Sequence, residues 1–465
     1  MSLISNLTNT ARTLNAHSAG VEAAGKNIAN ANDPAYARQR VEYGDRGSVV
    51  TSLGPQNLGI EAIGLQQVRD RFLDAQIVSE SSRHQSLQAQ QLGWQMLQAA
   101  VGHEVNRAAG AVGEPGLAAG LAESVDAFFN SFHGLAANPT SGTEKQEVLQ
   151  QATLLADRIQ SMDAKLVEVE ASLSGRLESE VDAANTILER IAELNREIER
   201  FEVHREGAAV DLRDRRQELL EKLAGHIQVE VEPSATGKGR IDVFVLDAAD
   251  GRIPLLDRGE PGARLEVDGN RITAGGAEVL PRGGAVLGLQ RVSEEGVGVL
   301  REELANFTRQ LVTSVNEAYA VSGRTFFDPD GDTPDTLRVV ETAAGLRGAA
   351  EGGEAGSNEA ALAVAGLADR AFSRAEGDFV DGRFTSVVAD MVASTGQALR
   401  RTTAALENQE AVSRLLESQR QSYSGVSVDE EMADLIKFQR AFQASARVMN
   451  TVDAMLELIV TRLGR

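Results

Sequence analysis

The stretch LIKFQRAFQASARVMNTVDAMLELIVTRL, residues 435–463, spaces its apolar side chains as the face of a long helix does. The repeating positions, which alternate at intervals of three and four, are Leu435, Phe438, Phe442, Ser445, Met449, Val452, Leu456 and Ile459. This is the a/d seam of a coiled coil, and a helix of this kind cannot bury its apolar stripe alone. The stretch therefore predicts that the end of the chain packs against another helix.

The first thirty residues supply a matching helix. Its repeating apolar positions are Leu3, Leu7, Leu14, Val21 and Ile28, with the polar Thr10 and His17 at two further positions of the seam. We predict that residues 1–40 and 427–465 form one terminal domain in which the two helices pair as a coiled coil. Ordinary amphipathic helices packed on a globular core remain the alternative.

The helical pattern stops abruptly in NIANANDPAY, residues 27–36. Asparagine and aspartate favour turns, and the residue before a proline is pushed out of the helical region. We expect Asn30, Asn32, Pro34 and Tyr36 to form a corner where the chain leaves the terminal pair.

Helical patterns also dominate the middle of the chain, whereas one part has the period of strands. The expected helices cover residues 69–105, 117–136, 143–171, 176–203, 210–225 and 293–321, and helices resume after 385. The segments 227–233 and 241–247 alternate apolar and polar residues, as strands do. The predicted fold is mainly α: a long-helix middle domain (41–225, 286–325 and 386–426), an inserted antiparallel β domain (226–285) and a variable, partly flexible segment (326–385).

Composition and charge limit the possible partners. The net charge is −22, but the first fifty residues carry five basic and four acidic side chains, and the last forty carry five and six. The acidic middle argues against nucleic acid or an anionic membrane as a partner. No apolar run is long enough to span a membrane, and the start has no apolar signal segment. The absence of cysteine excludes disulfides and thiolate metal sites.

The sequence contains no complete catalytic motif. It lacks a G-x-G-x-x-G loop, a P-loop and a G-x-S-x-G elbow. His103 begins HEVNR, but Arg107 stands where a zinc protease needs its second histidine ligand. We therefore expect no enzyme activity and no cofactor.

Two acidic clusters have simple explanations. Asp328, Asp330 and Asp332 fit the first ligand positions of an EF-hand, but its required glycine and glutamate are absent, so an acidic surface turn is the preferred interpretation. The run 429–431 precedes a helix, whose N-terminus it complements. We expect no metal site at either cluster.

Several segments resemble a known family. NIANANDPAYARQ (27–39) and SGVSVDEEMADLIKFQRAFQASARVMNTVDAML (424–456) resemble the end signatures of the bacterial flagellar rod, hook and hook-associated proteins. Segments 68–76, 126–163 and 210–231 are similar to the hook-associated protein 1 branch of that family. About two-thirds of the chain shares the resemblance, which is missing over 235–285 and 325–385.

The resemblance implies a structural component of the flagellum that acts as an adaptor at the hook–filament junction. It implies that the terminal segments are disordered in the monomer and assemble through the two seams in the tubular core. The implied partners are other copies of the chain, hook protein, hook-associated protein 3, an export chaperone and the type III export apparatus. The implied location is extracellular, on the flagellum, reached without a cleaved signal peptide.

Two alternatives remain from the sequence. The chain could be another axial protein, namely a hook protein, a distal rod protein or hook-associated protein 3. It could also be a helical adhesin or scaffold that binds a partner through its long helices.

Overall fold

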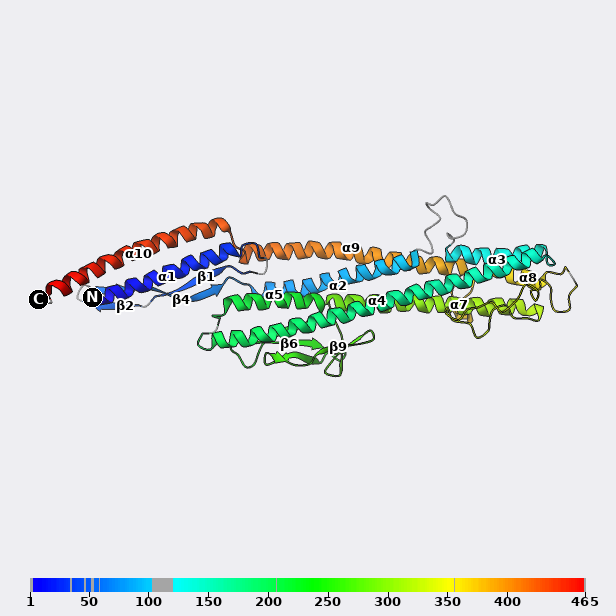
Figure 1. Cartoon of the computed structure of the whole chain (residues 1–465), viewed down its shortest axis with the longest axis horizontal. Helices are drawn as coiled ribbons and strands as arrows, with labels where there is room; N and C mark the ends of the chain where they lie inside the picture. The colour runs from blue at the N-terminus through cyan, green and yellow to red at the C-terminus, as the bar shows by residue number, and fades with distance from the viewer. Residues whose placement is uncertain are drawn as a thin grey trace.

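The computed structural model describes residues 3–33, 36–45, 47–51, 54–57, 59–102, 120–205, 207–354 and 356–463. The molecule is elongated, with its helices along the long axis and both ends of the chain at the same tip (Figure 1). The predicted fold class is confirmed, because long helices dominate and a small antiparallel β region lies in the middle of the chain. Among the described helices, none has the length and apolar character that crossing a membrane requires.

The tip of the molecule is built from both ends of the chain. Helices α1 (Leu3–Ala29) and α10 (Val428–Leu463) lie side by side and run in opposite directions (Figure 1). Helix α1 also packs on an antiparallel ribbon in which β1 (Gln39–Asp45) pairs with β4 (Ile60–Gln67). Strands β2 (Ser48–Thr51) and β3 (Gly54–Asn57) pair beyond it.

This ribbon corrects the sequence analysis, which assigned the chain from residue 41 onward to a helical domain. The four strands β1 to β4 lie between residues 39 and 67, so that assignment is wrong over its first part. The alternation of Val41 and Tyr43 is too short to separate a strand from a loop, and a bulge between Glu42 and Tyr43 interrupts it further.

Long helices form the body of the molecule. The major ones are α2 (Arg71–Gly102), α3 (Leu121–Ala137), α4 (Gly142–Glu202), α5 (Val210–His226), α6 (Gly284–Arg291), α7 (Val299–Tyr319), α8 (Glu359–Ala365) and α9 (Phe384–Ser424). A π-helical segment, η1 (Val292–Gly298), joins α6 to α7, and the short turns η2 (Ala320–Ser322), η3 (Gly366–Ala368) and η4 (Arg374–Glu376) complete the set. Figure 1 shows α9 running beside α2.

Two helix boundaries differ from those expected. The predicted helices 143–171 and 176–203 are one helix, α4, of 61 residues. Gly175 does not interrupt it, because the buried residues Leu173 and Leu177 continue the packed stripe on either side. The helix predicted for 293–321 begins as a π segment, where Gly296 lets the backbone approach Trp94 and Leu97.

The far end of the rod holds an aromatic core. Its fully buried rings are Phe128, Phe129, Phe132, Phe307, Tyr319, Phe326, Phe327 and Phe384. Several pairs meet edge to face, among them Phe326 and Phe327 at 5.0 Å between ring centroids. Segment 326–385, which the sequence left without a structural assignment, contributes three of these rings and so belongs partly to the packed core.

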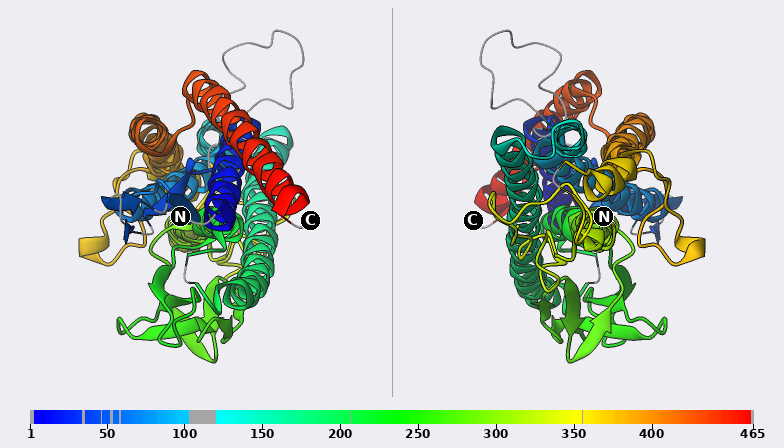
Figure 2. Two further views of the ribbon diagram at one scale, coloured as in Figure 1. Left: turned by 90° about the vertical axis from the view of Figure 1, so that its left-hand side faces the viewer. Right: turned by 90° about the vertical axis from the view of Figure 1, so that its right-hand side faces the viewer.

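The β insertion lies against α4 and projects to one side of the helices (Figure 2). One sheet contains β5 (Glu230–Pro233), β6 (Ile241–Leu246), β7 (Arg252–Asp257) and β8 (Glu260–Pro261) in that order. The second contains β9 (Leu265–Asp268), β10 (Arg271–Ala274) and β11 (Ala277–Val279), with β10 in the centre. Two buried asparagines of α4 hold the insertion: Asn185 exchanges hydrogen bonds with the backbone of Leu265, and Asn195 does so with that of Ile241.

Candidate functional site

Most of the seam residues predicted on α10 are partly buried, and α10 contacts α1. The half-buried positions on α10 are the predicted Leu435, Phe438, Phe442, Ser445, Met449, Val452 and Leu456, whereas Ile459 is exposed. On α1, Leu7, Leu14, Val21 and Ile28 are also half-buried, and the side chain of Leu3 lies outside the described residues. The two predicted stripes are therefore on helices that contact each other, and their role in assembly stays a prediction.

Small side chains form the most deeply buried part of α1. Ala16, Gly20, Ala23 and Ala24 are buried between α10 and the β1–β4 ribbon. A Cβ atom at Gly20 would lie only 2.8 Å from the ring of Phe438. The sequence analysis missed these residues, although the run HSAGVEAAG (17–25) is unusually rich in small side chains and indicates close helix packing.

The centre of the corner is Asn27, whose side chain is 1% exposed. Its Nδ2 donates to the backbone oxygen of Gln39 and to Oε2 of Glu431, both at 2.9 Å. Its Oδ1 accepts from the backbone N–H of Gln39 at 2.9 Å and from the hydroxyl of Tyr36 at 3.0 Å. One amide thus joins the end of α1 to the chain after the turn and to the start of α10.

Charged side chains extend this contact. Arg38 donates through Nε to Glu431 at 2.6 Å and through Nη1 to Glu430 at 3.0 Å. The sequence pattern predicted that the run 429–431 precedes the helix, whereas α10 begins at Val428 and Glu430 and Glu431 lie in its first turn, where Glu431 is buried and has specific partners. Asp211 of α5 accepts from Gln39 at 2.8 Å and from Lys26 at 3.4 Å. The corner therefore joins α1, β1, α5 and α10.

The four predicted corner residues contribute unequally. Tyr36 bonds to Asn27, as described, and its hydroxyl pKa is raised by burial and by the nearby Asp214 and Asp211. Asn30 and Asn32 are exposed, and the side chain of Asn30 donates to the backbone oxygen of Lys26 at the helix end. Pro34 lies outside the described residues. Sequence reasoning located the turn but missed Asn27, Arg38 and Glu431.

A second polar cluster lies beside the corner. Arg69 contacts Asp214 at 3.0 Å and Asp74 at 3.4 Å, and both carboxylates are largely buried. Burial raises the pKa of Asp214 to about 7, although the positive charge of Arg69 acts in the opposite direction. Burial also raises the pKa of Asp74. Arg69 thus ties the link between β4 and α2 to α5.

The outer face of α10 carries a second apolar stripe. Its exposed members are Val428, Met432, Ile436, Val448, Met455, Leu458, Ile459 and Val460. Val460 is 70% exposed. These residues form two groups, 428–436 and 448–460, with exposed polar and charged residues between them, and large apolar side chains left exposed in such groups are typical of interaction surfaces.

The carboxylates of the acidic loop at 328–332 bind arginines. Asp328 bonds to Arg338 at 2.6 Å and to the backbone of Asp330, which lowers the Asp328 pKa, and Asp332 pairs with Arg309 at 3.0 Å. These carboxylates are thus engaged by arginines. His103 and Arg107 lie outside the described residues. Across the described ranges, no group of three histidine or acidic side chains is placed to hold a metal ion.

Comparison with known proteins identifies two matched segments. Residues 113–325 match the family model described as "Flagellar hook-associated protein FlgK helical domain". Residues 412–462 match the model described as "Flagellar basal body rod FlgEFG protein C-terminal".

Similar proteins share modest identity with the chain. The protein named Flagellar hook-associated protein 1 of Bacillus subtilis (strain 168) is 24% identical, and the alignment covers 97% of each chain. The protein of the same name from Escherichia coli (strain K12) is 22% identical over 72% of this chain and 60% of its own length. Among solved structures, the flagellar hook junction protein FlgK from Burkholderia pseudomallei aligns with a TM-score of 0.44 at 19% identity, over 54% of this chain and 46% of that one.

Proposed function

We infer that the chain is a member of the flagellar hook-associated protein family and a structural component of the bacterial flagellum, the adaptor at the hook–filament junction. The observation that carries this inference is the similarity to a hook-associated protein 1 over 97% of both chains. The match of the helical body to the corresponding domain family supports it independently of the chain ends.

We propose that the terminal helices are the assembly elements. Helix α10 packs one apolar stripe on α1 and leaves the outer stripe, Val428 to Val460, exposed. In a helical assembly each copy presents different surfaces to its neighbours, so an outward stripe can be covered by the next copy while the inner stripe stays within the pair. In this proposal the two seams and the outer stripe together form the contacts on which assembly depends.

The remaining proposals concern domains, partners and route. We propose the terminal domain 1–40 with 427–465, a helical middle domain, an inserted β domain at 226–285 and a variable segment at 326–385. Other copies of the chain, hook protein and hook-associated protein 3 are the proposed partners, and the chain has no catalytic role. An export chaperone and the flagellar type III apparatus would deliver it outside the cell without cleavage of a signal peptide.

Deletion of the gene tests the functional assignment. Cells should make bare hooks and release flagellin into the medium, as seen by electron microscopy and by assay of the supernatant. Loss of the hooks themselves would instead favour a rod or hook protein, an alternative that the C-terminal match to the rod-protein family keeps open. Intact flagella would overturn the assignment to any axial position.

The outer stripe is tested in the complemented deletion strain. Met455→Glu places a charge on the exposed apolar stripe and should abolish filament attachment while the purified monomer unfolds as the wild type does. Asn450→Glu, which adds the same charge at an exposed polar position of α10, is the matched control and should attach filaments normally. Equal motility of the two strains would refute a role for the stripe.

A further inference from the structure

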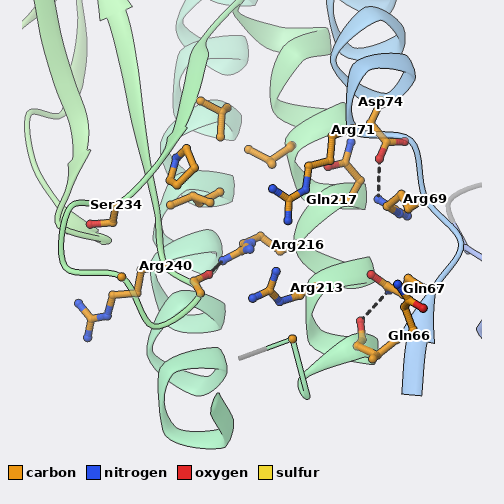
Figure 3. A pocket seen from close by; sticks show the side chains of 18 of the residues that line it. Gln66, Gln67, Arg69, Arg71, Asp74, Arg213, Arg216, Gln217, Ser234 and Arg240 are labelled. Atoms are coloured by element: carbon orange, nitrogen blue, oxygen red, sulfur yellow. Dashed lines mark hydrogen bonds and ion pairs between the residues drawn. The ribbon is translucent and has the colours of Figure 1, made fainter. Parts of the chain in front are cut away.

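A pocket of about 670 Å³ lies where three parts of the chain meet. Its walls come from the end of β4 and the start of α2, from α5, and from the turn between β5 and β6 (Figure 3). The volume falls within the roughly 300–1,000 Å³ of small-molecule sites. None of the functions derived above uses this pocket.

Arginine dominates the lining of the pocket. Its six arginines are Arg69, Arg71, Arg205, Arg213, Arg216 and Arg240, and its three carboxylates are Glu42, Asp74 and Glu232. The lining is therefore net positive in a chain whose net charge is −22. Such a local reversal of charge favours an anion in a recess with protein walls.

Not all six arginines face the interior. Figure 3 shows Arg71, Arg213 and Arg216 pointing into the pocket, whereas Arg240 points away from it. Arg240 is bound to Glu199 and Glu260, and Arg69 is bound to Asp74 and Asp214. The three inward guanidinium groups come from the start of α2 and from α5.

Arg216 is the unusual member of this group. It is 7% exposed, and its Nη1 donates to Oδ1 of Asn195 at 2.8 Å and to the backbone oxygen of Gly239 at 2.7 Å. Within the described residues no carboxylate lies at ion-pair distance from it. Burial and the like charge of Arg213 lower the pKa of Arg216 to about 10, although the negative charge of Glu202 acts in the opposite direction. A buried cation that no carboxylate contacts directly is costly, and an anion in the pocket would offset part of that cost.

Arg213 and Arg71, which also point into the pocket, add to its attraction for an anion. Arg213 is held by Glu202, at 2.6 Å between Nη2 and Oε2, so its position is fixed beside Arg216. Burial alone would raise the pKa of Glu202, but the bonds from Arg213 and from the backbone of Gly207 and Ala209 lower it, so this partner stays ionised. Arg71 is exposed and has no ion pair among the described residues, which leaves its guanidinium available to a ligand.

We propose that this pocket binds a small polyvalent oxyanion, held by Arg216 and Arg71, with Arg213 adding positive charge beside them. The shared chemistry is a phosphate or a multiple carboxylate, either of which an arginine binds through parallel hydrogen bonds. A bound anion would link the start of α2 to α5 and so brace the joint beside the terminal pair. The proposal is independent of the role at the hook–filament junction.

Titration calorimetry on the full chain tests the proposal with inorganic phosphate, pyrophosphate and citrate, at a constant ionic strength set by sodium chloride. The wild type should bind at least one of them saturably, and the phosphates and citrate distinguish the two sources of the oxyanion. Arg216→Gln should weaken the affinity at least about tenfold, because it removes a charged hydrogen-bonding partner. Arg71→Gln should weaken it as well, and it is the decisive variant if Arg216→Gln fails to fold.

Arg401→Gln is the control, because Arg401 is an exposed arginine of α9 far from the lining residues and without an ion pair among the described residues. It should bind as the wild type does. Equal affinity in the wild type, Arg71→Gln and Arg401→Gln would overturn the proposal. The absence of saturable binding of all three anions to the wild type would overturn it too.

Discussion

Replacement of Asn27 with alanine should loosen the corner at which this amide joins the end of α1 to β1 and to the start of α10. The amide makes four hydrogen bonds, to the backbone of Gln39 twice, to Tyr36 and to Glu431. Its truncation leaves a buried backbone N–H and C=O without their partner, next to a carboxylate that loses one donor. The damage should be confined to the corner, because the apolar contacts of the rod are untouched.

The size of the effect follows from these bonds. Neutral hydrogen bonds contribute about 1 kcal/mol each and one to a charged group about 1.5–3 kcal/mol, which gives a ceiling of about 4.5–6 kcal/mol. The four bonds share one side chain, so they do not add, and water can reach the half-buried Tyr36. We expect a loss of about 2–4 kcal/mol in the local free energy of opening.

Hydrogen exchange measures this opening directly, since a chain with several packed parts does not unfold in a single two-state step. Amides of residues 39–45 should exchange roughly 30- to 700-fold faster in Asn27→Ala than in the wild type. Asn30→Ala removes an exposed amide of the same corner, three residues further along the chain, whose bonds water can replace, and the exchange of residues 39–45 should change only a few-fold. If the two variants exchange alike, the reasoning about the buried amide is wrong.

Three further predictions follow from the same contacts. Gly20→Ala should destabilise the α1–α10 pair because its Cβ meets Phe438, whereas Gly25→Ala, with open space around it, should stabilise the helix by about 0.5–1 kcal/mol, so urea unfolding should give opposite signs. The raised pKa of Asp214, about 7, means that the folded chain binds its proton more tightly than the unfolded chain, so stability should fall as the pH rises from about 4 to 7. Unfolding at pH 4.5 and 8 should show the wild type losing about 1–3 kcal/mol more than Asp214→Asn over this range, and equal losses would exclude Asp214 as the cause. Phe442→Asp should leave a soluble folded monomer, checked by circular dichroism, that fails to assemble, and normal flagella from this variant would contradict the role of the seam.

Sequence periodicity was informative where packing is local and regular. The stripe of α10 could be predicted because a helix repeats its contacts every three or four residues. The turn after α1 could be located because Asn and Pro act on their immediate neighbours. The same kind of evidence failed for β1 and β4, whose alternation is short and broken by a bulge.

The corner could not be derived from the sequence, because its contacts are between distant residues. Asn27 and Glu431 are 404 positions apart, and nothing in either local pattern shows that they meet. Glycine was misleading in both directions. The helix break predicted between residues 171 and 176, where Gly175 lies, is absent, while Gly20 was overlooked although Phe438 packs on it. A glycine costs a helix about 1 kcal/mol, which tertiary packing along α4 outweighs.

The chemistry of the corner bears on how an adaptor can hold its shape. Apolar contacts are not directional, so two packed helices can slide or rotate at modest cost. Hydrogen bonds and ion pairs weaken steeply when distance and angle change. The terminal domain meets the rod through such contacts, from Gln39 and Lys26 to Asp211 and from Arg69 to Asp214 of α5, while Asn27 and Arg38 hold α10 in place through Glu431. A change in the angle between pair and rod must therefore break several of them together. The corner should thus prefer one angle and switch cooperatively, rather than bend continuously.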